Sequence, residues 1–173
     1  LGYPEQARAR AKESLAASEG AFLHAMALCN ECYLHHFRGD CAAVEANVAA
    51  MLDLSAEKGL VVFHELGRVF QGWALAHRGA VEDGIRMMRD AIARLDATEQ
   101  KVEQPYMISI LAETYLQAGR WREAREQLDV ALRLVENTDE RWYEAELHRL
   151  AGDIVLARGD AADAEAQFKR ALD

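Results

Sequence analysis

Hydrophobic and polar positions along this chain recur with the spacing of amphipathic helices, and the same arrangement returns every 40 residues. Four glycines that end helical runs stand 40 positions apart, at Gly39, Gly79, Gly119 and Gly159. Each is preceded at seven positions by a small residue and followed at five, nine and twelve positions by small or apolar residues. Because glycine adopts the left-handed conformation that ends a helix without a Cβ clash, each marks a turn between two helices. The pattern predicts a series of helical hairpins.

The predicted elements divide the chain into one unpaired helix, over residues 4–18, and four hairpins. The hairpins cover about 21–57, 61–97, 105–136 and 141–172. A single hairpin cannot bury its own apolar faces, so copies stack into a solenoid. We therefore expect an all-α, right-handed superhelix that forms one repeat domain over residues 1–173. The chain begins Leu-Gly-Tyr-Pro without a methionine, which indicates a fragment of a longer protein.

The spacing resembles that of the tetratricopeptide repeat, which has about 34 residues, with each unit lengthened here to 40. The segment 140–150, and Pro105-Tyr106 followed by 111–113, resemble the C-terminal arm of bacterial signalling proteins. These proteins join a class III nucleotide cyclase, such as an adenylate cyclase, to an ATPase and then to such repeats. A LuxR-type transcriptional regulator carries a related ATPase and arm. The resemblance implies an arm that senses a protein or ligand and controls the ATPase, and leaves open whether the output domain is a cyclase or a DNA binder.

The amino-acid composition limits the classes of partner that the chain could bind. Lys and Arg number 20 against 29 Asp and Glu, a net charge of -9, which disfavours nucleic acids and anionic membranes. No apolar run approaches the roughly 18 residues of a membrane span. Three cysteines cannot all pair with one another, which favours a reducing, cytoplasmic location.

Motifs for catalysis are missing from the sequence. It has no G-x-x-x-x-G-K-[ST] phosphate loop and no G-x-S-x-G nucleophile elbow. His64-Glu65 begins like a zinc-protease helix, but Arg68 stands where the second histidine belongs. We therefore predict that this chain is not an enzyme and needs no cofactor.

The first helix of each hairpin in tetratricopeptide superhelices lines the concave face, and the resemblance carries that face onto this chain. By register one row contains Tyr33, Trp73, Glu113 and Asp153, and another contains Phe37, His77, Gln117 and Ala157. The N-terminal half is aromatic and the C-terminal half charged, which suits a peptide or small ligand. The predicted binding residues are Tyr33, Phe37, Trp73, His77, Tyr106, Glu113 and Arg149. The alternative is that the aromatics pack against the next repeat.

Two further functions stay open. Cys29, Cys32 and His36 lie within about 60° of one another on one helical face and could hold a metal ion with a fourth ligand. The simpler interpretation is that Cys32 fills the small-residue position of the repeat. The unpaired first helix, with Leu1, Tyr3, Ala11 and Leu15, could instead mediate self-association into a homodimer.

Overall fold

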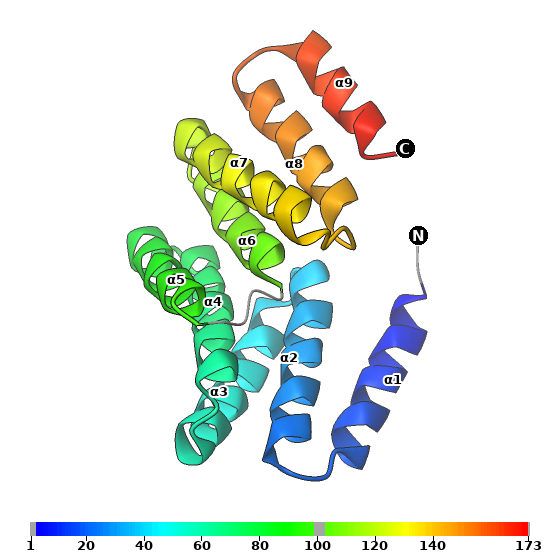
Figure 1. The fold of residues 1–173 in the computed structure, drawn as a ribbon, viewed down its shortest axis with the longest axis vertical. Coiled ribbons are helices and arrows are strands. Elements are labelled where there is room, and N and C mark those ends of the chain that lie inside the picture. The colour runs from blue at the N-terminus through cyan, green and yellow to red at the C-terminus, as the bar shows by residue number, and fades with distance from the viewer. Residues whose placement is uncertain (1–2, 99–102, 173) are drawn as a thin grey trace. The chain divides into compact units, whose positions relative to one another are not determined.

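A computed structural model of the chain describes residues 3–98 and 103–172. Within these ranges the chain forms nine α-helices and no strand (Figure 1). The helices group into two compact units, an N-terminal unit over Leu1–Leu95 and a C-terminal unit over Asp96–Asp173. The expectation that residues 1–173 form one repeat domain stays a prediction.

The N-terminal unit contains the unpaired helix and two hairpins. Its helices are α1 (Pro4–Ala17), α2 (Ala21–Phe37), α3 (Cys41–Lys58), α4 (Val61–His77) and α5 (Val81–Asp96). Helix α2 packs against α1, α3 and α4, so consecutive hairpins share a core. The core side chains include Val44, Val48, Met51, Val69 and Phe70, which are buried. We call α2 and α4 first-type helices, and α3 and α5 second-type helices.

The C-terminal unit repeats this plan with two further hairpins. Its helices are α6 (Gln104–Gln117), α7 (Trp121–Thr138), α8 (Glu144–Ala157) and α9 (Ala161–Arg170). Here α6 and α8 are of the first type, α7 and α9 of the second. Helix α7 packs between α6 and α8, and α9 packs on α8. Leu111, Leu128, Ala131 and Leu147 lie in the buried core.

Each of the four hairpin turns has the same hydrogen-bonded cap. At the first of them, Gly39 has a φ of 65°, its N–H donates to the His36 carbonyl (2.9 Å), and the Asp40 N–H donates to the His35 carbonyl (2.9 Å). This is the Schellman arrangement, which satisfies carbonyls at the end of a helix. The turn role predicted for the repeating glycine is therefore confirmed.

Close approach of two helices depends on small residues in the second hairpin. A Cβ atom on Gly72 would lie 2.7 Å from the Gly84 carbonyl oxygen, and one on Gly84 would lie 2.3 Å from the Gly72 oxygen. The backbones of α4 and α5 therefore touch at this crossing. In the fourth hairpin a Cβ on Gly152 would lie 2.3 Å from the Phe168 ring. Glycines at these positions therefore let the paired helices approach closely.

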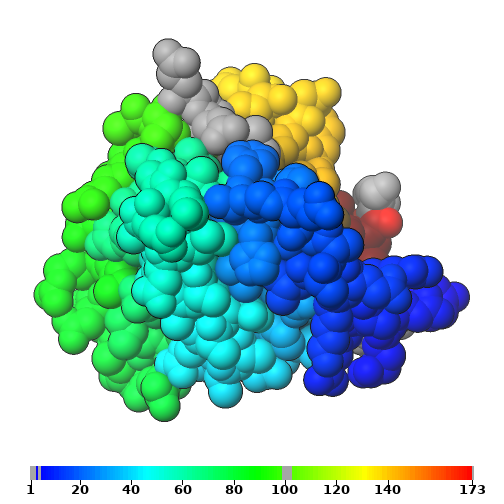
Figure 2. All heavy atoms as spheres, turned by 90° about the horizontal axis from the view of Figure 1, so that it is seen from below, coloured from blue at the N-terminus to red at the C-terminus, as the bar shows by residue number. Residues whose placement is uncertain are grey.

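The start of one helix differs from the sequence expectation. Helix α8 begins at Glu144, whereas the pattern placed its start at 141. Residues just before it are held in a turn, because the Glu140 carboxylate accepts hydrogen bonds from the Glu103 N–H (2.9 Å) and the Trp142 indole N–H (2.9 Å). Helix α1 projects at the edge of its unit, in dark blue in Figure 2, and among its described side chains those of Ala11 and Leu15 are partly buried while the rest are exposed.

Candidate functional site

First-type helices α2 and α4 contact each other directly and gather aromatic rings between them. The Tyr33 and Phe70 rings meet edge to face, with centroids 5.5 Å apart. The His36 ring packs on Trp73 at 4.8 Å, and Trp73 lies 4.2 Å from the His77 ring. Tyr33 is 9% exposed and Trp73 is 3% exposed. These two rings are therefore buried between the helices and offer little surface of their own.

Histidine chemistry in this cluster follows from burial. Burial in an aromatic environment disfavours the imidazolium, and the neighbouring His77 adds to this, so the pKa of His36 is lowered to about 4. His36 is therefore neutral at physiological pH. The His77 Nδ1 atom lies 3.1 Å from the Trp73 carbonyl oxygen one turn earlier, which fixes the orientation of that ring.

An apolar stripe runs along α2 beside these rings. Phe37 is 55% exposed, and Phe22 and Met26 on the same helical face are also exposed. The Phe22 ring touches Phe63 of α4 edge to face at 5.2 Å. We define the inner stripe as Phe22, Met26 and Phe37. Large exposed apolar side chains that share one face are typical of an interaction surface.

The inner face of the C-terminal unit has a different chemistry. Tyr106 is fully buried, with ring centroids 5.5 Å from Trp142 and 4.8 Å from Tyr143. A side-chain hydrogen bond joins Tyr143 to Ser109. Burial raises the pKa of Tyr143, and the Glu146 carboxylate raises it further, so the phenol stays protonated.

Charged side chains lie beside these rings. The Arg149 guanidinium donates hydrogen bonds to Glu146 and to Asp153, one turn away on either side along α8. On α6 the Gln117 amide donates to the Glu113 carboxylate over 3.3 Å. The carboxylates of Glu113, Glu146 and Asp153 and the guanidinium of Arg149 are thus available here to polar groups of a ligand.

The predicted binding residues thus separate into buried and accessible ones. Tyr33, Trp73 and Tyr106 are buried in ring contacts. Accessible surface remains on the other four, which are Phe37, His77, Glu113 and Arg149. The structure groups Tyr33, Phe37, Trp73 and His77 in the N-terminal unit and the other three residues in the C-terminal unit. Their assignment to a binding groove stays a prediction.

The metal alternative does not fit the side-chain geometry. Among the described residues, no group of three or more His, Cys, Asp or Glu side chains is arranged to hold a metal ion. Cys29, Cys32 and His36 share a face of α2 without forming such a group. Burial raises the pKa of Cys32 to about 12, so its thiol is protonated and packs as a small apolar residue.

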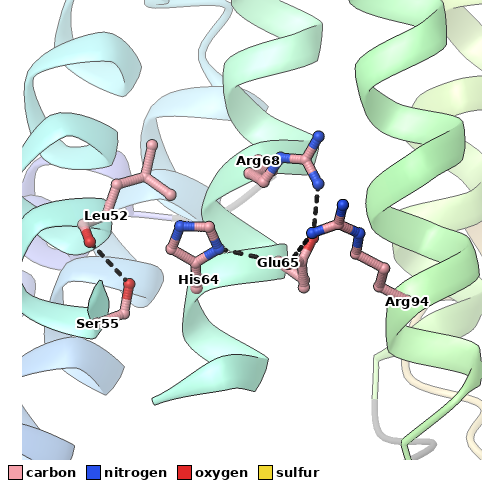
Figure 3. Close-up of polar contacts among 6 residues, drawn as sticks. All are labelled: Leu52, Ser55, His64, Glu65, Arg68 and Arg94. Carbon is pink, nitrogen blue, oxygen red and sulfur yellow. Dashed lines mark hydrogen bonds and ion pairs between the residues drawn. The ribbon is translucent and has the colours of Figure 1, made fainter. Parts of the chain in front are cut away.

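The residues that begin like a zinc-protease helix have a structural role. Figure 3 shows the buried Glu65 carboxylate between Arg68 and Arg94, with His64 beside it. Arg68 donates to Glu65 over 3.0 Å, and Arg94 of α5 lies 3.5 Å away. The cluster compensates a buried charge and links α4 to α5.

Sequence reasoning missed two features of the surface. Phe22 was overlooked as a member of the inner stripe, although it lies four residues before Met26 and thus on the same face. A hollow between α7, α8 and α9 was also overlooked; it is lined by Trp121, Arg125 and Arg158, among others. The sequence contains a signal for this hollow in the reversed charge at one repeat position, because Arg125 stands where Glu45 stands 80 residues earlier.

Comparisons with known proteins agree with this architecture. Residues 105–173 match the family model described as tetratricopeptide repeat. Two crystal structures of kinesin light chain TPR-like repeats from Podosopora anserina, one of them a point variant, are similar to the chain. They have TM-scores of 0.60 and 0.57 and sequence identities of 13% and 14%, and each comparison covers 98% of this chain and 83% of the other. No curated protein has a significantly similar sequence.

At these identities the structural similarity establishes the fold alone. The predicted all-α solenoid of tetratricopeptide-like hairpins is therefore confirmed. Tetratricopeptide repeats in general mediate protein–protein interactions or serve as scaffolds. Of the helices in the described ranges, none has both the length and the apolar character needed to cross a membrane.

Proposed function

We propose that this chain is a protein-binding arm of a cytoplasmic bacterial signalling protein and that it binds its partner on the inner faces of its first-type helices. The observation that carries the proposal is the exposed inner stripe of α2, in which Phe37 lies next to the buried His36, Tyr33 and Trp73 cluster. An apolar side chain of a partner placed on Phe37 would remove its ring from water beside this buried aromatic cluster.

The partner surface would combine apolar and polar groups. Burial of the exposed part of a phenylalanine ring contributes about 1–2 kcal/mol, which suits a reversible complex. Glu113 and Arg149 would orient polar groups of the ligand in the C-terminal unit. Ligand binding would then act on an attached ATPase through its different affinities for two conformations of the arm.

A peptide-selection experiment tests the binding face directly, because random peptides stand in for the partner. A phage-displayed library of random peptides is panned on the 173-residue chain, and selected peptides are measured against Phe37→Ala. We expect an apolar residue common to the peptides and an affinity loss of about ten-fold, which corresponds to about 1.4 kcal/mol. The matched control is Leu172→Ala, because Leu172 follows α9, is 88% exposed and belongs to no first-type helix. Equal losses in both variants would refute the proposed face.

The signalling context rests on the resemblance of the segments around Tyr106 and 140–150, and it has its own test. The sequence that flanks residues 1–173 in the full-length protein should encode an ATPase with a G-x-x-x-x-G-K-[ST] loop. It should also encode either a nucleotide cyclase or a LuxR-type DNA-binding domain. Flanking sequence without an ATPase would refute this part of the proposal and leave the binding face untouched.

Self-association is the second candidate function, and the exposure of α1 favours it. Tyr3 is 76% exposed, and α1 has no first-type helix paired with it in the described ranges. Leu1, which the sequence suggested as part of this surface, lies outside the described residues. Native mass spectrometry tests it: a dimer that loses stability on Tyr3→Ser and Leu15→Ser would support self-association, and a monomer would refute it.

A further inference from the structure

Two ion pairs in the N-terminal unit join a hairpin to the helix before it, at the same two positions of the repeat. Arg78, at the end of α4, donates to the Glu45 carboxylate of the preceding second-type helix α3 over 3.0 Å. Forty residues earlier, Arg38 at the end of α2 lies 3.6 Å from Glu5 of α1. In both cases the carboxylate is on the helix that precedes the first-type helix, α3 or α1, and the arginine follows the first-type helix.

In the C-terminal unit the carboxylate position is an arginine. Residue 125 of α7 corresponds to Glu45, and residue 158 after α8 corresponds to Arg78. Both Arg125 and Arg158 line one hollow of about 330 Å³ between α7, α8 and α9. Two arginines therefore occupy the positions that the Arg78–Glu45 ion pair, which has no net charge, occupies in the other unit.

The lining of this hollow includes an apolar floor beside its charged and polar groups. The side chains of Ile154 and Val155 are buried beneath it, and Trp121 forms another wall. The corresponding residues of the other unit are smaller at two of the three places, with Cys41 in place of Trp121 and Ala74 in place of Ile154. There the Cys41 thiol approaches the Ala74 carbonyl oxygen at 3.6 Å.

The two arginines have partners that they can leave at small cost. Arg125 donates to Asp129 over 2.8 Å, and Arg158 lies 3.1 Å from Asp160 and 3.7 Å from Asp163. All of these groups are substantially exposed, and exposed ion pairs contribute about 0–1 kcal/mol. A ligand anion could therefore replace an aspartate as the partner of either guanidinium.

We propose that this hollow binds a small organic monocarboxylate with an aliphatic body. The carboxylate would accept hydrogen bonds from Arg125 and Arg158, and the aliphatic body would lie against the apolar floor. Asp163 also lines the hollow, and Asp129 and Asp160 pair with the same two arginines, so carboxylates lie around both guanidinium groups. These negative charges favour a monoanion over a phosphate dianion. The volume of the hollow is at the lower end of the range for small-ligand sites, roughly 300–1,000 Å³.

N-acetyl-leucine and its neutral amide form a matched pair of probes for this site. The 173-residue chain is titrated with each probe, and the NMR signals of the indole N–H groups of its three tryptophans are followed. The signal that is missing from the Trp121→Phe variant is that of Trp121. We expect N-acetyl-leucine to shift the Trp121 signal saturably and the amide to bind at least about ten-fold more weakly. Inorganic phosphate should also bind more weakly than the carboxylate.

Charge reversal separates the proposed site from a general electrostatic effect. Arg125→Glu restores the residue type of the N-terminal unit, so we expect a new ion pair with Arg158, no loss of thermal stability, and at least about a ten-fold loss of N-acetyl-leucine affinity. Arg133→Glu makes the same charge change at an exposed position of α7 outside the hollow and should leave affinity unchanged.

Three results would overturn the proposal. The first is the absence of a saturable Trp121 shift up to about 10 mM probe, which corresponds to a binding free energy weaker than about 3 kcal/mol. The second is equal affinity for N-acetyl-leucine and its amide. The third is an equal effect of the Arg125→Glu and Arg133→Glu variants on affinity. Arg158→Gln, which leaves α7 unchanged, supplies a second measure of the arginine requirement should Arg125→Glu alter the fold.

Discussion

The contact between Gly72 and Gly84 makes a sharp prediction for the stability of the N-terminal unit. In Gly84→Ala the new Cβ would lie 2.3 Å from the Gly72 carbonyl oxygen and 2.9 Å from the Ala76 nitrogen. Ordinary contact begins at 3.4 Å, so the deficit is 3.4 − 2.3 = 1.1 Å. Because both obstructing atoms belong to the backbone of α4, no side-chain rotation relieves the clash. Helices α4 and α5 have to separate.

The magnitude follows from two opposing effects. Alanine is favoured over glycine inside a helix by about 1 kcal/mol. Against this, a gap of roughly 0.5–1 Å forfeits about a quarter to a half of the dispersion energy of each contact it opens. Ile85 and Met88 of α5 are buried at this crossing and would lose such contacts. Overpacking usually costs about 1–3 kcal/mol and occasionally more, and we expect a net destabilisation of about 2 kcal/mol.

Gly67→Ala is the matched control, because Gly67 of α4, like Gly84 of α5, is a buried glycine inside a helix. Its Cβ would meet Leu52 Cδ2 at 3.0 Å and Met51 Cε at 3.1 Å, which are the ends of flexible side chains that can move. The gain in helix propensity therefore offsets the small repacking cost, and we expect a free energy of unfolding within about 0.5 kcal/mol of the unsubstituted chain.

Urea unfolding measures both variants. Trp121→Phe and Trp142→Phe in the background leave Trp73 as the fluorescent reporter of the N-terminal unit. With a slope of about 2 kcal/mol/M, the Gly84→Ala midpoint should fall by about 1 M. If Gly84→Ala were as stable as Gly67→Ala, the argument from backbone contact would be wrong.

Three further predictions concern single residues. Gly119→Ala should lower the free energy of urea unfolding by about 1 kcal/mol, because φ at this position is 74° and no atom obstructs a Cβ there. Gly119→Asn should lower it less, because asparagine tolerates this conformation better. Equal losses in the two variants would contradict the conformational explanation. The His36 pKa of about 4 lies below its ordinary 6.5, so the unfolded chain binds the proton more tightly. The contribution of His36 to stability is thus fully present above about pH 6.5 and is lost as the pH falls toward about 4, by about 3 kcal/mol; the pH dependence of unfolding for His36→Phe should lack this loss. Cys32, whose pKa is raised to about 12, should resist thiol reagents at about pH 8 until urea unfolds the chain, as peptide mass mapping can establish; modification of the native protein at Cys32 would contradict its burial.

The candidate binding face could be predicted only in part. Register alone placed Tyr33, Phe37, Trp73 and His77 on first-type helices, because one repeat position keeps one orientation. Register does not state how deeply a side chain is covered. Phe37 remains exposed near the end of α2, while the neighbouring α4 covers Tyr33 through Phe70.

The helices and their turns could be read from local sequence. The 40-residue interval between glycines and the apolar stripe of each helix are local properties, and the caps that they produce involve residues a few positions apart. Three other properties emerged only in the folded chain: which helices touch at backbone distance, that Cys29, Cys32 and His36 do not form a metal site, and that Arg125 and Arg158 line one hollow. Those properties depend on side chains contributed by different helices, whose separation and mutual burial arise only when the hairpins pack.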